Sequence, residues 1–257
     1  FTDEWGGGGR ARCRAWDPLT WGADAIYDIV DGKLEFRSHF KMPAPQLETE
    51  NCVAHNGSIV PIPGRDIFVQ AWYQGGISVI DFTDSANPVE IAYFDRGPIL
   101  EDELITGGYW SVYYYEGAIY GTEITRGLDV LKLLPSEYMS ENEIAAAAIA
   151  YPVIGPSRVF NPQQQVPMTW PATPEVAHAY IDQLLRNKAI SEDAAERMGE
   201  MLGQVKQAMD NGGDNRLARR ISNYRLSAKA ANLDALTQHR LEKLHTTLKG
   251  IAVGLRD

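Results

Sequence analysis

Hydrophobic and polar residues alternate in short runs over the first half of the chain, which is the pattern of half-buried β-strands. The clearest runs are residues 67–72 (IFVQAW), 76–81 (GISVID), 119–124 (IYGTEI) and 127–132 (GLDVLK). Turn signals separate the strands, at residues 31–32 (DG), 63–66 (PGRD), 84–88 (DSANP) and 116–117 (EG). We therefore expect antiparallel sheets of short strands joined by tight turns.

These runs form a repeat. The order strand, turn, strand, glycine, strand occurs twice with a spacing of 52 residues, and a more divergent copy covers residues 1–5 and 25–29. Four short strands repeated about every 50 residues are typical of a β-propeller blade. A plain antiparallel sandwich is the alternative that the pattern leaves open.

Apolar residues recur at helical spacing after residue 173. Thr173 is a candidate N-cap with Pro174 at the first helical position, and Ser191 is a candidate N-cap for a second helix that ends at residues 210–215. A third helix is expected around residues 217–226, and a fourth begins at Asn232 or Asp234. One apolar stripe per helix predicts a small antiparallel bundle.

Composition changes at the same point in the chain. Of the 25 aromatic residues, 23 precede residue 174, and the net charge changes from −12 before that point to +2 after it. The fold class expected is α+β, with two to three incomplete four-stranded propeller blades followed by an α-helical bundle. The expected boundaries are a partial propeller over 1–150, a Pro/Gln-rich linker over 151–173 and the bundle over 174–257.

Charge and hydropathy exclude two classes of partner. A net charge of −10 offers no basic patch for phosphates, so no nucleic-acid partner is expected. No apolar run approaches the roughly 20 residues of a transmembrane helix.

The two cysteines, Cys13 and Cys52, lie in polar or Gly-rich connections, where a disulfide would join two loops. Two unrelated buried thiols are the alternative.

Residues 76–89 (GISVIDFTDSANPV) resemble the LVIVD repeat of bacterial secreted and cell-surface β-propellers. The match extends over residues 76–96 and is partial over 119–134, where Lys132 replaces the repeat's Asp. The resemblance implies a propeller and an extracellular, cell-surface or periplasmic location, and it implies no established reaction. Since only about two and a half blades are visible and propellers need about four to eight, we expect further N-terminal blades, or blades from another copy. We also expect an open fan of sheets, with exposed apolar side chains near Phe1.

Blade geometry predicts a candidate site. The longer connections fall on one face of the blades, and loops on a rigid scaffold commonly bind ligands. Strand starts and ends on that face place nine residues near one mouth of the channel: Glu4, Trp5, His55, Asn56, Gln70, Trp72, Trp110, Glu123 and Arg126.

Two functions are compatible with this site. The first is an exported, non-enzymatic binding or interaction protein that holds a protein or cell-surface ligand on aromatic loops and needs no cofactor. The second is a metal-dependent or hydrolytic enzyme in which His55, Glu4 and Glu123 hold a divalent metal ion or exchange protons. No specific catalytic motif favours the enzyme.

Overall fold

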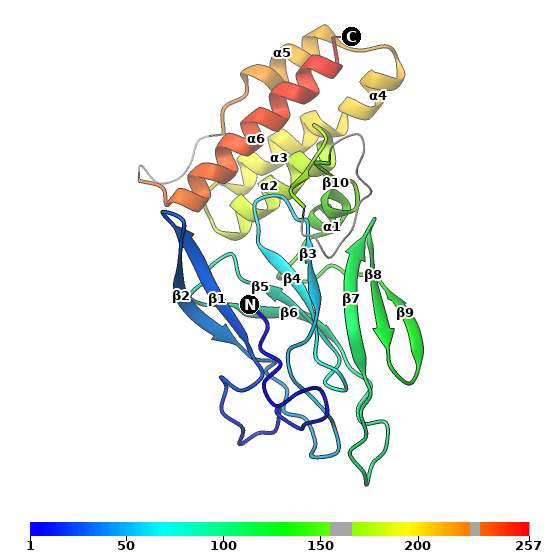
Figure 1. Ribbon diagram of the computed structural model, residues 1–257. Helices are drawn as coiled ribbons and strands as arrows, with labels where there is room; N and C mark the ends of the chain where they lie inside the picture. Colours follow the sequence, from blue (N-terminus) through cyan, green and yellow to red (C-terminus); the bar gives the residue numbers. More distant parts are fainter. Residues whose placement is uncertain (155–165, 227–231, 257) are drawn as a thin grey trace. The chain divides into compact units, whose positions relative to one another are not determined.

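The computed structural model describes residues 1–154, 166–226 and 232–256 (Figure 1). They form two compact units. The first unit comprises Phe1–Pro61, Arg65–Leu133 and Val153–Pro167, and the second comprises Ile62–Gly64, Leu134–Pro152 and Met168–Asp257. The prolines and glutamines that predict a linker lie mostly within 155–165, outside the described residues.

A four-stranded antiparallel meander is the largest sheet of the first unit. Its strands are β3 (Gly57–Val60), β4 (Ile67–Ala71), β5 (Ile77–Asp81) and β6 (Val89–Phe94), paired in chain order. Both faces of β5 are buried, as its nearly continuous apolar sequence requires. This sheet has the four consecutive strands that the repeat predicts for one blade.

The next sheet has three strands rather than four. β7 (Tyr109–Tyr115), β8 (Ala118–Glu123) and β9 (Gly127–Leu131) pair in chain order, and Glu116 and Gly117 form the first turn at positive φ. The segment after β9 leads into the short helix α1 (Glu141–Ala148), which lies inside the range predicted to be β-structure. Its start is fixed by a capping box, because Ser140 Oγ accepts from Glu143 N at 3.1 Å and Ser140 N donates to Glu143 Oε2 at 2.8 Å.

The N-terminal sheet is a two-stranded hairpin of β1 (Asp24–Val30) and β2 (Lys33–Phe40). Its turn contains Asp31 and Gly32, both at positive φ, as the Asp-Gly signal predicts. Thr2 forms a single bridge to Asp24, which places the first residues beside β1 without making a regular strand. Phe1 and several apolar residues of this hairpin are exposed: Phe1, Tyr27, Ile29, Val30, Leu34 and Phe36.

The first unit therefore contains small antiparallel sheets of two, four and three strands. Together with the helices they make a mixed α+β fold, as expected. The described strands do not form a closed barrel or a closed ring of blades.

The second unit is helical, with two departures from the predicted elements. Its further helices are α2 (Pro174–Arg186), α3 (Glu192–Gly203), α4 (Val205–Asp210), α5 (Asn215–Asn223) and α6 (Ala235–Gly254). The predicted second helix is divided into α3 and α4, with Gly203 and Gln204 at the division, because glycine weakens a helix interior. α5 ends at Asn223, before the predicted limit at residue 226.

The residues that cap α3 and α6 are ones that the sequence offers as N-caps. Ser191 caps α3, and Asp234 rather than Asn232 caps α6 by accepting from Thr237 N at 2.8 Å. The core of this unit includes a large apolar cluster of described residues, among them Tyr180, Leu184, Met198 and Leu248. A two-residue ladder of β10 (Tyr151–Pro152) and β11 (Met168–Thr169) lies within the range predicted as linker.

None of the described helices has both the length and the apolar character needed to cross a lipid bilayer.

Candidate functional site

Four side chains from distant parts of the first unit meet in what we call the aromatic cluster: Glu4, His55, Tyr73 and Trp110. The His55 ring lies 4.9 Å from the Tyr73 ring and 4.4 Å from the Trp110 ring, measured between centroids. The Tyr73 hydroxyl donates to Glu4 Oε1 at 2.5 Å, and His55 Nε2 lies 3.9 Å from the same oxygen. His55 Nδ1 is 2.5 Å from the carbonyl oxygen of Trp110.

The sheets of the first unit position this cluster. His55 precedes β3, Tyr73 follows β4, and Trp110 is the second residue of β7. β7 contacts both β3 and β4, and Tyr109 N donates to Tyr73 O at 2.9 Å. Strand pairing therefore fixes three of the four side chains, and only Glu4 depends on the N-terminal segment.

Tyr73 has an unusual backbone conformation, and two glycines approach it closely. Its φ is 54°, in the left-handed region that aromatic residues rarely adopt. A Cβ on Gly108 would lie 1.9 Å from the Tyr73 carbonyl carbon, and a Cβ on Gly8 would lie 2.4 Å from the Tyr73 hydroxyl. The Gly-rich insertion at residues 6–9 thus approaches the buried Tyr73 ring closely.

The electrostatics of the cluster keep Tyr73 as a hydrogen-bond donor. Burial, and then the hydrogen bond to Glu4, raise the pKa of the Tyr73 hydroxyl well above its usual range. The phenol therefore stays protonated, and Glu4 accepts its proton in a hydrogen bond. Half of the Trp110 side chain is exposed, while the Tyr73 side chain is buried beneath it.

A second group of rings begins at the residue after Glu4. The Trp5 and Trp21 rings lie 4.7 Å apart, and the Arg12 guanidinium lies 4.8 Å and 5.2 Å from their centroids. A cation over two indole rings is attractive, and it orders all three side chains. Trp5 remains 46 % exposed, so the two groups of rings together provide an open aromatic surface on the loops.

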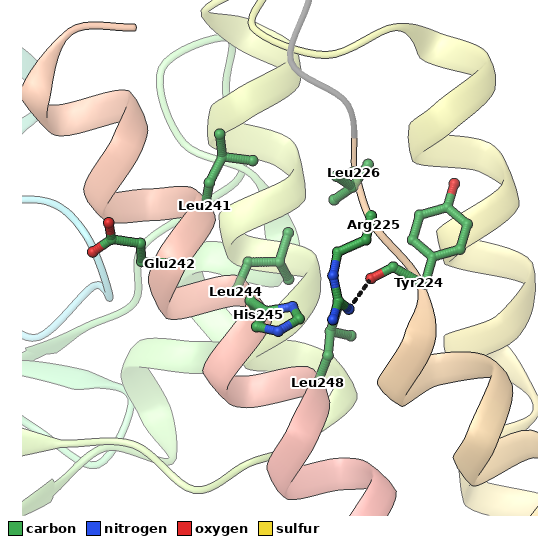
Figure 2. Close-up of a pocket in the computed structure, with 8 residues that line it drawn as sticks. All are labelled: Tyr224, Arg225, Leu226, Leu241, Glu242, Leu244, His245 and Leu248. Atoms are coloured by element: carbon green, nitrogen blue, oxygen red, sulfur yellow. Dashed lines mark hydrogen bonds between the residues drawn. The ribbon is translucent and has the colours of Figure 1, made fainter.

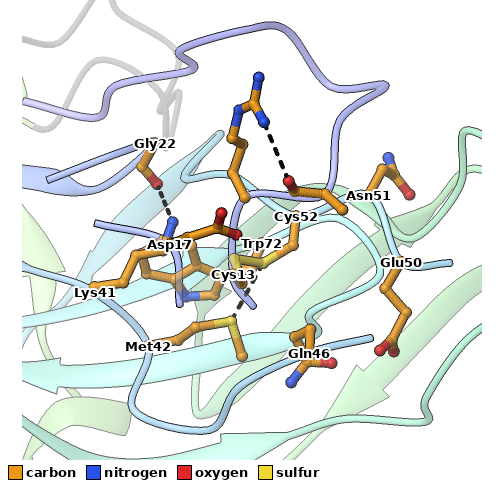
Figure 3. Close-up of a disulfide and its surroundings, with 12 residues drawn as sticks. Cys13, Asp17, Gly22, Lys41, Met42, Gln46, Glu50, Asn51, Cys52 and Trp72 are labelled. Atoms are coloured by element: carbon orange, nitrogen blue, oxygen red, sulfur yellow. Dashed lines mark hydrogen bonds between the residues drawn. A yellow bond between two sulfur atoms is a disulfide. The ribbon is translucent and has the colours of Figure 1, made fainter. Parts of the chain in front are cut away.

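The predicted disulfide between Cys13 and Cys52 is present, with a Cα–Cα distance of 5.6 Å (Figure 3). It joins the loop that carries Arg12 to the segment before His55. Backbone hydrogen bonds support the same junction, since Arg12 N donates to Cys52 O at 3.2 Å. The bridge is buried, and Met42 Sδ lies 3.4 Å from Cys52 Sγ.

Two further ionisable residues, the half-buried Lys41 and the buried Asp24, carry no signal in the sequence. Lys41 Nζ donates to the carbonyl oxygen of Trp21 at 2.5 Å. It also donates to the carbonyl oxygen of Gly22 at 3.1 Å, as Figure 3 shows. The carboxylate of Asp24 is buried and has no hydrogen-bond partner among the described residues. Burial raises the pKa of Asp24 to about 7 and lowers the pKa of Lys41 to about 8. Asp24 is the first residue of β1 and Lys41 directly follows β2, and neither position carries a local sequence signal of burial.

Three predicted site residues are held in or beside β3 and β4 by hydrogen bonds. Trp72 is fully buried in the core around the disulfide, where its Nε1 donates to Ser78 Oγ at 2.9 Å. Gln70 is fully buried, and its Nε2 donates to Ala71 O at 2.8 Å. Asn56 is half-buried, and its carbonyl oxygen accepts from Ala71 N at 2.9 Å.

Glu123 ends β8, and Arg126 lies in the turn that follows it. The buried Glu123 carboxylate accepts from Gly108 N at 2.7 Å, from Thr125 N at 2.8 Å and from Arg126 N. These bonds hold the two loops next to β7 and β8. The exposed Arg126 side chain donates to Pro98 O at 3.3 Å.

A metal centre made of Glu4, His55 and Glu123 is not formed by this arrangement. Among residues 1–154, 166–226 and 232–256, no group of three or more His, Cys, Asp or Glu side chains is arranged to hold a metal ion. Glu4 and His55 do approach each other, but the Glu123 carboxylate is occupied by backbone N–H groups.

Comparisons of the chain with models of protein families, with curated protein sequences and with solved structures yield no match.

Proposed function

We propose that this chain belongs to an exported β-propeller-type protein that binds a protein or cell-surface ligand on its aromatic loop surface and catalyses no reaction. The observation that supports this best is the half-exposed pair of Trp5 and Trp110, attached to a fixed framework of Glu4, His55 and Tyr73. Tryptophan and tyrosine contribute more binding free energy per residue than most other types at interfaces.

Preorganisation of the surface supports the same proposal. Loops that bind partners lose less entropy when their side chains are already fixed before binding. Here the hydroxyl of Tyr73 and the guanidinium of Arg12 hold the surrounding groups in place. The disulfide fixes the loop that carries Arg12.

Two features support the location and the architecture. An intramolecular disulfide is typical of proteins in oxidising compartments, which include the periplasm and the cell exterior. The resemblance to the LVIVD repeat covers β5, β6 and the turn between them, where Asp84 Oδ2 accepts from Asn87 Nδ2 at 2.9 Å. The four-stranded meander of β3 to β6 is the sheet that a propeller blade would have.

The alternative, a metal-dependent or hydrolytic enzyme, rests on the approach of His55 to Glu4 at 3.9 Å. A carboxylate beside an imidazole is a pair suited to proton transfer. Elemental analysis of the purified protein distinguishes the two functions. Stoichiometric metal in the wild type that is absent from His55→Ala would support the enzyme and contradict our proposal.

The binding proposal is tested directly with immobilised extracellular proteins and cell-surface polysaccharides as probes. We expect saturable binding to at least one probe, and a loss of tenfold or more in affinity for Trp5→Ala/Trp110→Ala. The control is Tyr93→Ala, which removes a ring that is 75 % exposed on β6, outside the aromatic cluster. Binding that the double variant leaves unchanged, or that the control weakens equally, would show that the aromatic surface is not the binding site.

A further inference from the structure

The helical unit contains a pocket of its own, far in sequence from the aromatic cluster. It has a volume of about 250 Å³ and lies between α6 and the residues that follow α5 (Figure 2). One part of its wall is apolar and another part is cationic, and both parts come from described residues of the second unit.

The apolar wall is formed mainly by one stripe of α6. Leu241, Leu244 and Leu248 recur at helical spacing and face Leu226 across the pocket (Figure 2). Leu244 and Leu248 are almost fully buried and also belong to the core of the unit. This wall would be firm, because packing in the core already fixes its side chains.

The cationic wall is formed by Arg225, and the imidazole of His245 lies beside it. Arg225 Nη1 donates to the carbonyl oxygens of Ser222 at 3.0 Å and Tyr224 at 3.1 Å, which fixes the guanidinium at the pocket. Figure 2 shows this guanidinium next to the imidazole of His245. Within the described part of the chain, Arg225 forms no ion pair with a carboxylate. Burial, and then the charges of Arg225 and Lys249, lower the pKa of His245, which disfavours its charged form and leaves the imidazole as a hydrogen-bonding group.

One carboxylate lines the pocket, but it is directed elsewhere. Glu242 Oε1 accepts from Gln238 Nε2 at 3.0 Å, one turn away on α6. Figure 2 shows the Glu242 side chain pointing away from Arg225. The cationic wall is therefore without an anionic partner in the part of the molecule that the structure describes.

Size and charge together define the ligand. A group the size of a water molecule takes about 30 Å³ in a liquid, so 250 Å³ accommodates about eight such groups. We propose that the pocket binds a free medium-chain carboxylate, with its alkyl chain along Leu241, Leu244 and Leu248 and its carboxylate on Arg225 and His245. Arginine and carboxylate pair through parallel N–H···O bonds, which would orient the ligand.

Octanoate is the probe that tests this site. Calorimetric titration of the full chain is expected to give one saturable site for octanoate and none for octylammonium, which has the same chain and the opposite charge. Arg225→Gln should weaken octanoate binding at least tenfold. The matched control, Arg219→Gln, removes an exposed arginine of α5 that does not line the pocket and should change the affinity less than twofold.

Two further measurements test the proposal if the Arg225→Gln variant folds poorly. His245→Gln should also weaken octanoate binding, and octanoate should shift the ring resonances of His245 in the wild type. Equal binding of octanoate and octylammonium would identify an unspecific apolar cavity and overturn the proposal. Absence of octanoate binding at millimolar concentration, or binding insensitive to both substitutions, would overturn it as well. None of these outcomes depends on the aromatic cluster, so the proposed function stands or fails separately.

Discussion

At the scale of single residues, side chains that are adjacent in the sequence can lie in different environments. Trp72 ends in the core, while Tyr73, the next residue, turns to the aromatic cluster. The positive φ of Tyr73 makes this possible, because it reverses the chain directly after β4. Asp24 shows the complementary case, since its strand position buries a carboxylate that accepts no hydrogen bond from any described group.

We predict that Asp24→Asn stabilises the protein at pH 8 and has little effect at pH 4. Burial raises the pKa of Asp24 to about 7 from its ordinary 3.8, so the folded state loses stability as the pH rises through this interval. Asparagine avoids the cost of a buried charge and should add about 2–4 kcal/mol at pH 8. Urea unfolding at both pH values measures the difference. The control is Asp31→Asn in the exposed turn, and an equal effect of Asp24→Asn at both pH values would contradict the prediction.

At the scale of elements, local signals set most boundaries of strands and helices. The Asp-Gly and Glu-Gly turns and the caps Ser191 and Asp234 occur where the sequence predicts them. Their contributions differ according to the hydrogen bonds that they make. Asp234 accepts from the backbone of Thr237, whereas the Thr173 side chain forms no cap bond at the start of α2.

We therefore expect Asp234→Ala to lower the free energy of unfolding by about 1 kcal/mol, the usual cost of losing an N-cap hydrogen bond. Thr173→Ala is the matched comparison. Its hydroxyl makes no hydrogen bond among the described residues, so removing it should cost much less. Thermal or denaturant unfolding followed by circular dichroism compares the two variants. Equal costs would mean that the cap of α6 contributes no specific stability.

The disulfide acts between elements, and its removal has a predicted cost. It closes a loop with a sequence separation of 39 residues, for which loop entropy gives about 3–4 kcal/mol. Cys13→Ala/Cys52→Ala should lower the free energy of unfolding by this amount. A reductant should destabilise the wild type similarly and leave the double variant unchanged. A loss below about 1 kcal/mol would show that the loops are held by their other contacts.

At the scale of the whole molecule, each unit must bury its own apolar surface, and the β1–β2 hairpin does this incompletely. Ile29 and Leu34 are directly paired across the two strands and are 76 % and 70 % exposed. Exposed apolar groups of this kind mark surfaces that pack against another partner. A further blade is the partner that our proposal of a propeller requires.

We predict that Ile29→Glu/Leu34→Lys reduces self-association of the chain without lowering its melting temperature. Opposite charges directly across a strand pair are favourable, and neither apolar side chain contributes to a core. Sedimentation velocity and binding of a hydrophobic dye measure the effect. Tyr93→Lys, on the separate sheet of β6, should leave both quantities unchanged. A melting temperature lowered by more than about 5 °C, a shift that indicates a loss of about 1 kcal/mol or more, would indicate that this face is already packed.

The sequence by itself determined the strands around residues 67–81 and 119–131, the turns between them, the starts of α2, α3 and α6, and the single possible cysteine pair. Each of these depends on a period, a cap or a turn residue within a few positions of the chain. It did not determine α1, because an Ala-rich run of eight residues is too short to be distinguished from a strand region by periodicity.

Only the tertiary structure decided which of the predicted site residues meet. It brought Glu4, His55 and Trp110 together, added Tyr73, and placed Gln70 and Trp72 in the interior and Glu123 on backbone N–H groups. Blade geometry predicts at which end of a strand a residue lies. Whether its side chain points to the interior or to the surface depends on strand twist, turns and close approaches of other segments. The positive φ of Tyr73 goes together with the close approach of Gly108 to its backbone. Gly108 is distant from Tyr73 in the sequence, so no local sequence pattern predicts this contact.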